Sequence, residues 1–75
     1  MNEDLGEKIR RLRRESGFTQ GELVKILNVS AQAVSKWERS KTCPDVMTLP
    51  TLASLLGVTT DELLGCEKYG EEFHE

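Results

Sequence analysis

The sequence predicts an all-α fold built from five short helices. Apolar residues recur at helical spacing, as at Leu5, Ile9 and Leu12, which share one helix face. The pattern Ser/Thr/Asp-x-x-Glu, which caps the N-terminus of a helix, stands before several of the apolar runs. β-branched residues are scattered and do not alternate with polar residues as they do in a half-buried strand. A chain of 75 residues is therefore expected to form one helical domain of modest stability.

The first helix is expected over residues 5–16. Asp4 is a suitable N-cap, and Glu7 stands three residues later, where it completes a capping box. Gly17 can adopt the left-handed conformation that ends a helix, so it marks the C-terminal boundary.

The second and third helices are expected at Gln20–Leu27 and at residues 31–38. Thr19 opens a second capping box before the first of them, and Asn28 ends it. Ser30 is the N-cap of the third helix, whose inward residues are Val34 and Trp37. Two short helices separated by three residues are typical of the helix-turn-helix unit.

The rest of the chain predicts two further helices. A polar loop at 39–45 has no periodic apolar face. Pro50 suits the first turn of a fourth helix, and Gly57 ends that helix. A third capping box at 59–62 opens the fifth helix, which carries Leu63 and Leu64.

Charge divides the chain into two unequal parts. Residues 5–43 carry a net charge of +5, whereas residues 44–75 carry −6, and the whole chain carries −3. The basic part indicates a polyanionic partner, although a solvated helix face explains the same arginines. We expect a domain at 5–64 and a disordered acidic tail at 65–75.

Other features exclude several classes of function. Cys43 and Cys66 are isolated and form no CxxC pair, so free thiols in a reducing cytoplasm are expected. The acidic N-terminus does not read as a secretory signal, and no segment is apolar enough to span a membrane. His74 has no partners for catalysis, so we predict no enzyme, catalytic residue, metal or cofactor.

Residues 19–44 contain the series Thr-Gln-x-x-Leu, Val-Ser, a polar helix and Trp-Glu-x-Ser-x-x-x-Pro. This series, together with residues 5–13 and 52–64, resembles the phage repressor/Cro family of helix-turn-helix domains, also called the xenobiotic-response-element family. The resemblance implies a five-helix, lambda-repressor-like fold in a bacterial or phage transcriptional regulator. It also implies a repressor that binds a palindromic operator in double-stranded DNA as a homodimer.

Physical chemistry points to DNA through the third helix, because an α-helix fits the major groove. Glutamine suits a bidentate bond to adenine, and lysine suits the acceptors of guanine. Gln20 stands at a helix N-terminus, which suits a phosphate. If the arginines of the first helix also face phosphates, affinity should fall steeply with salt. The predicted DNA-binding residues are Gln20, Ser30, Ala31, Gln32, Ala33, Ser35, Lys36, Arg39, Lys41 and Thr42.

The family resemblance assigns a structural role to two further residues. It implies that Arg13 and Glu38 form an ion pair that orients the third helix. Trp37 is expected in the core. Ser40 stands where the family commonly has glycine, so the loop after the third helix is expected to differ locally.

An interaction module is the alternative to a regulator. An antitoxin or anti-regulator would use the fourth and fifth helices and the acidic tail to hold a protein partner or an unknown effector domain. The two hypotheses differ in whether the purified chain retards duplex DNA without a partner.

Overall fold

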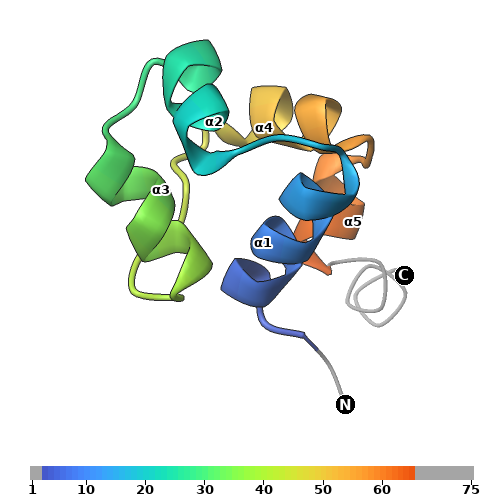
Figure 1. The fold of residues 1–75 in the computed structure, drawn as a ribbon. Coiled ribbons are helices and arrows are strands. Elements are labelled where there is room, and N and C mark those ends of the chain that lie inside the picture. Colours follow the sequence, from blue (N-terminus) through green and yellow to red (C-terminus); the bar gives the residue numbers. More distant parts are fainter. Residues whose placement is uncertain (1–2, 66–75) are drawn as a thin grey trace, which may run out of the picture.

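The computed structural model describes residues 3–65 and contains five helices and no strand in that range (Figure 1). The all-α prediction and the order of the helices are confirmed, and the first helix ends one residue earlier than expected. The helices are α1 (Leu5–Glu15), α2 (Gln20–Leu27), α3 (Ala31–Glu38), α4 (Leu49–Leu56) and α5 (Thr60–Leu64).

Capping residues define where the helices begin. All three predicted capping boxes form, and each uses both reciprocal hydrogen bonds. In α1, the Glu7 backbone N–H donates to Asp4 Oδ1 at 2.9 Å. The predicted N-cap of α3 also forms, because Ser30 Oγ accepts from the Ala33 N–H at 3.0 Å. The remaining boxes open α2 and α5, at Thr19–Glu22 and Thr59–Glu62.

Left-handed residues end the helices and turn the chain. Asn28 ends α2 with φ at 57°, and Gly57 ends α4 with φ at 77°. Ser40 follows α3 with φ at 61°, a conformation that costs an L-residue free energy. The expected local difference at Ser40 therefore takes the form of a strained serine in the conformation that glycine would adopt.

Helix α1 lies at the centre of the packing. It contacts α3 on one side and α5 on the other, while α2 and α4 close the top of the core as seen in Figure 1. The buried apolar side chains come from all five helices, which agrees with the predicted inward positions of α3. They are Ile9, Leu23, Val34, Trp37, Leu52, Ala53, Leu56 and Leu63.

Gly6 allows α1 to approach the C-terminus of α3 very closely. The residue is buried, and a Cβ placed on it would overlap the Trp37 carbonyl oxygen and lie 2.8 Å from the Ser40 nitrogen. At the same end of α1, Lys8 Nζ donates to the Glu62 carbonyl at 3.0 Å and ties α1 to α5. The first helix thus fixes the position of α3 through backbone contact.

Some predictions fall outside the described residues. These are the predictions on Cys66, His74 and the acidic tail beyond Gly65. Cys43 is described, and it is exposed and free. Within residues 3–65, no helix has the length and hydropathy needed to cross a membrane.

Candidate nucleic-acid interface

Helices α2 and α3 form a helix-turn-helix unit. Residues 28–30 connect them, and the turn is closed by a hydrogen bond from the Val29 N–H to the Val24 carbonyl at 3.2 Å. Asn28 supplies the left-handed residue, and Ser30 caps the next helix. The turn chemistry is therefore local and follows from residue types at fixed positions.

The two faces of α3 differ in burial. Val34 has no exposed surface, and only 5% of Trp37 is exposed, so both anchor the helix to the core. Ala31, Gln32 and Lys36 are exposed. Because Gln32 and Lys36 are four residues apart, they share the outward face of the helix.

The other predicted DNA-binding residues border this face. Ala33 and Ser35 are half-buried, whereas the remaining members are exposed. The loop after α3 folds back on the helix, because the Lys41 N–H donates to the Lys36 carbonyl at 2.8 Å. Arg39 Nε donates to the Ser35 carbonyl at 3.4 Å, which draws its side chain along α3. The exposed members of this border are Gln20, Ser30, Arg39, Lys41 and Thr42.

Glu38 connects three helices through one carboxylate. Arg13 Nε donates to Oε2 at 2.6 Å and Arg13 Nη2 donates to Oε1 at 3.2 Å, so the ion pair that the resemblance implies is present in the structure. Arg13 Nη1 also donates to the Phe18 carbonyl at 2.9 Å. The side chains of Arg13 and Glu38 are only 11% and 3% exposed, so water screens the pair weakly.

Gln20 is the third member of this cluster. Its contact with Glu38 could not be predicted from the sequence. Its Nε2 donates to Glu38 Oε1 at 2.9 Å. A primary amide has two N–H donors, so one remains available after this bond. The contact therefore fixes the amide while leaving a donor beside the backbone N–H groups at the start of α2.

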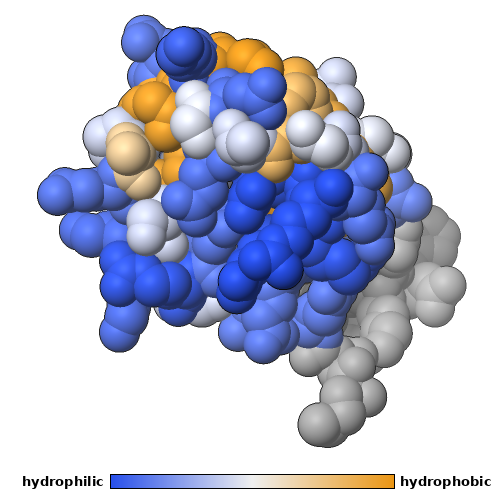
Figure 2. Space-filling model, in the orientation of Figure 1, coloured by the Kyte–Doolittle hydropathy of each residue, from blue (hydrophilic) through white to orange (hydrophobic). Residues whose placement is uncertain are grey.

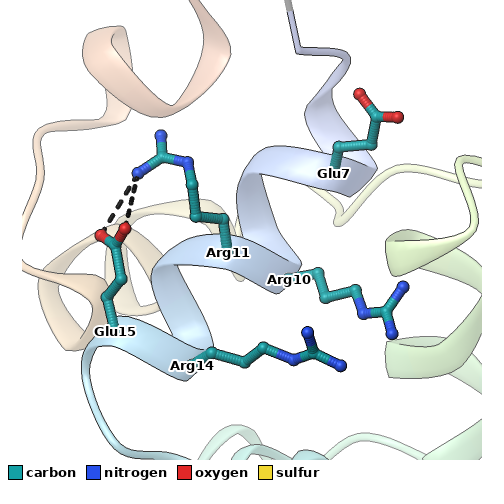
Figure 3. A pocket seen from close by; sticks show the side chains of 5 residues that line it. All are labelled: Glu7, Arg10, Arg11, Arg14 and Glu15. Atoms are coloured by element: carbon teal, nitrogen blue, oxygen red, sulfur yellow. Dashed lines mark hydrogen bonds and ion pairs between the residues drawn. The ribbon is translucent and has the colours of Figure 1, made fainter.

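The arginines of α1 fall into two groups that their spacing in the sequence does not distinguish. Arg11 is paired with Glu3 at 2.8 Å and with Glu15 at 3.2 Å. These two carboxylates raise the pKa of Arg11 above its ordinary value. Arg10 and Arg14 have no ion pair with any carboxylate of residues 3–65. In Figure 3 they extend away from Arg11 and Glu15, toward α3.

The surface around α1 and α3 is strongly hydrophilic. On the face shown in Figure 2, the most hydrophilic residues cover α1 and the adjoining end of α3, while hydrophobic residues gather at the top over α2 and α4. Residues 3–65 hold no group of three or more His, Cys, Asp or Glu side chains placed to bind a metal ion.

These features define the class of helix-turn-helix domains. A capped helix and a tight turn precede a short polar helix, and a tryptophan holds that helix against the core. The profile of a protein family described as "Helix-turn-helix" matches residues 9–63. The chain belongs to this family, of the xenobiotic-response-element type, as the sequence resemblance implied. It is a family of DNA-binding transcriptional regulators, which is not an enzyme class.

Relatives at the sequence level carry regulatory names. The HTH-type transcriptional activator BcrR of Enterococcus faecalis is 38% identical over 65 residues, covering 87% of this chain and 32% of BcrR. The prophage-derived regulator YonR of Bacillus subtilis is 37% identical over 59 residues, covering 79% of this chain and 55% of YonR. Repressor protein C2 of Salmonella phage P22 is 42% identical over 60 residues, covering 80% of this chain and 28% of C2. The chain thus spans from about a third to about half of the length of these relatives.

Solved structures agree with the fold. The P22 c2 repressor, solved in complex with a synthetic operator, superposes with a TM-score of 0.78 at 38% identity, covering 84% of this chain and 96% of that one. The DNA-binding domain of the same repressor in solution gives a TM-score of 0.77 at 40% identity, covering 85% and 86%. The predicted lambda-repressor-like fold is therefore confirmed.

Proposed function

We propose that this chain binds double-stranded DNA sequence-specifically as the DNA-binding domain of a transcriptional regulator. The observation that carries the proposal is the division of α3 into a buried face with Val34 and Trp37 and an exposed face with Gln32 and Lys36. An α-helix anchored in this way can enter the major groove without losing its place in the core. The related P22 c2 repressor has been solved in complex with a synthetic operator, which supports DNA binding by this chain.

The residues of the interface divide by the part of DNA they meet. Gln32 and Lys36 read base edges, and the small side chains of Ala31 and Ala33 let the backbone approach and meet thymine methyl groups. The other predicted DNA-binding residues surround α3 and bind the phosphates that border the groove. This second group contains Gln20, Ser30, Ser35, Arg39, Lys41 and Thr42.

The chain acts as a homodimer on a palindromic operator, in the cytoplasm, where it represses transcription. An eight-residue helix reads too few base pairs to find one site in a genome, and two-fold symmetry doubles the site. Repression is supported by the likeness to the P22 repressor, whereas the likeness to the activator BcrR favours the opposite outcome. A reporter placed behind the selected site decides between the two directions.

Selection of bound sequences from a random duplex pool tests DNA recognition directly. We expect one enriched sequence with two inverted half-sites about 10 base pairs apart. Affinity for that sequence should fall steeply between low and moderate salt, because phosphate contacts release counterions. Failure of the purified chain to retard any duplex would favour the alternative, an antitoxin or anti-regulator that needs a protein partner.

A further inference from the structure

We propose that Arg10, Arg14 and Arg39 form a phosphate-binding site between α1 and α3, beside the N-terminus of α2. Its ligand is a DNA backbone phosphate beside the groove that α3 enters, so the inference rests on the proposed function. The structural basis is one hollow of about 390 Å³ that these three arginines line together. The hollow is completed by Arg13, Gln20, Ser35 and Glu38.

Helix geometry places two of the arginines side by side. Arg10 and Arg14 are four residues apart on α1, so their side chains leave the same face of the helix. Figure 3 shows both guanidinium groups pointing toward α3. Arg39 reaches the hollow from the end of α3, where its Nε is held by the Ser35 carbonyl. Three forked donors therefore converge from two helices.

The charge of the hollow is unbalanced. It is lined by four arginines and one glutamate, which leaves an excess of three positive charges. Glu38 does not offset the other arginines, because its buried carboxylate is already bonded to Arg13 and Gln20. Like charges four apart on a helix also repel each other. An anion between Arg10 and Arg14 removes that repulsion.

The position of the hollow favours a phosphate of the bound DNA as the anion. Gln20, at the start of α2, lines the same hollow, so the two phosphate-binding features adjoin. Ser35 lies on α3, the helix that enters the groove in the proposed function, and Arg39 is its C-cap. Guanidinium groups bind phosphate oxygens in bidentate geometry, and several together favour a dianionic or backbone phosphate over a neutral ligand. The site thus extends the DNA interface from α2 and α3 onto α1.

Arg11 provides a matched control on the same helix. The substitutions R10Q, R14Q and R11Q each remove one positive charge from α1, but Arg11 is paired with Glu3 and Glu15 and points away from α3. Affinity for the selected operator is measured for each variant over a series of salt concentrations, and thermal melts verify folding. Ethylation interference then maps which phosphates each protein needs.

We expect R10Q and R14Q to weaken binding about tenfold and to lower the slope of log affinity against log salt by about one. R11Q should change neither value appreciably, and the double variant R10Q/R14Q should lose interference at one phosphate per half-site. Equal effects of R10Q, R14Q and R11Q would overturn the site and leave only a diffuse positive field. If the parent chain bound no duplex at all, the proposed function would fail, and the site would fail with it.

Discussion

Glu38 Oε2 lies 2.6 Å from Arg13 Nε, and the pair joins the last turn of α1 to the last turn of α3. Glu38 is the one buried charged residue among residues 3–65. Its second oxygen also holds Gln20, so a single carboxylate sets the relative positions of α1, α2 and α3. The position of the exposed face of α3 therefore depends on this buried contact.

Replacement of Glu38 by alanine should destabilise the fold more than it alters sequence preference. The change leaves the Arg13 guanidinium, only 11% exposed, without its carboxylate partner, a loss of about 2–3 kcal/mol in unfolding free energy. Release of Gln20 should also weaken binding to all sequences alike. Thermal and denaturant unfolding measure the first effect, and affinity for the operator and its single-base variants measures the second.

Glu15→Ala is the control for this substitution. Glu15 also pairs with an arginine, Arg11, but both side chains are largely exposed, so the pair contributes little to stability. The unfolding midpoint of the Glu15→Ala variant should stay close to that of the parent. If Glu38→Ala left the unfolding midpoint unchanged but abolished DNA binding, Glu38 would be a DNA-contacting residue and not a structural one.

Gly6→Ala should separate α1 from the end of α3. The new methyl group meets the Trp37 carbonyl and the Ser40 nitrogen, which are backbone atoms that cannot rotate away. Overpacking of this kind costs about 2 kcal/mol or more. The measurement is the unfolding free energy in denaturant. Gly21→Ala is the control, since its nearest neighbour is Thr19 Oγ1 at 3.8 Å, and helix propensity there favours alanine.

If Gly6→Ala lowers the unfolding free energy and Gly21→Ala raises it, then the close approach of α3, and not helix propensity, determines the effect of substitution at Gly6. Two losses of equal size would contradict this interpretation. A gain at Gly6 would show that α1 can shift away from α3 without loss.

The sequence predicted the helices well because their boundaries depend on local chemistry. Capping boxes such as Thr19–Glu22, and left-handed residues such as Asn28, act within three or four positions of the chain. The inward residues of α3 followed from helical periodicity in the same way. These features do not depend on how the helices pack.

Contacts between helices were much harder to predict from the sequence. The bond from Gln20 to Glu38 and the tight fit at Gly6 join residues far apart in the chain, and no spacing reveals them. The i, i+4 spacing of Arg10 and Arg14 was visible, but only the packed structure separates them from Arg11. The DNA contacts of individual residues stay predictions.

Ser40→Gly should raise stability. Ser40 has φ at 61°, where its Cβ crowds the backbone, and glycine removes that strain. After the larger entropy loss of glycine and the loss of the Ser40 hydroxyl contact to Asp4 are both subtracted, the expected gain is about 0.5 kcal/mol. Thermal unfolding measures the gain. Asn28→Gly, also left-handed with φ at 57°, should gain less because asparagine tolerates this region. Equal gains would contradict an account based on residue-specific strain.

Stability should fall at acidic pH through two turn carboxylates. The pKa of Asp4 lies below its ordinary value of 3.8, mainly because the Glu7 backbone N–H donates to it and further because the Ser40 hydroxyl does. The pKa of Asp45 is lowered by the hydroxyl and the N–H of Thr48. Both contributions are complete above the unfolded-state pKa and are lost as pH falls through the lower folded-state pKa.

Melting temperature measured from pH 7 to pH 2 tests this effect. The double variant D4N/D45N keeps side-chain oxygens that can cap, but it has no charge to titrate at these positions. Its curve should therefore decline less than that of the parent at the acid end. Parallel curves would show that Asp4 and Asp45 do not contribute to the acid sensitivity.

Gln32→Ala should relax sequence recognition without harming the fold. Gln32 is exposed on α3, so its removal leaves no buried group unpaired and the melting temperature should not change. A bidentate contact from glutamine to adenine is worth about 1–3 kcal/mol of discrimination. The loss should fall on one base pair in each half-site, and two-fold symmetry should repeat it about 10 base pairs away.

Binding of Gln32→Ala to every single-base variant of the operator distinguishes base reading from backbone attraction. Lys41→Ala is the control, because loss of a phosphate contact weakens all variants alike and lowers the salt slope. Lys41 is exposed in the loop after α3, so its truncation leaves the helix in place. If Gln32→Ala discriminates among the variants as the parent does, α3 does not read bases through Gln32. The buried anchors Val34 and Trp37 would then still position α3, but recognition would have to come from Lys36 or from the shape of the DNA.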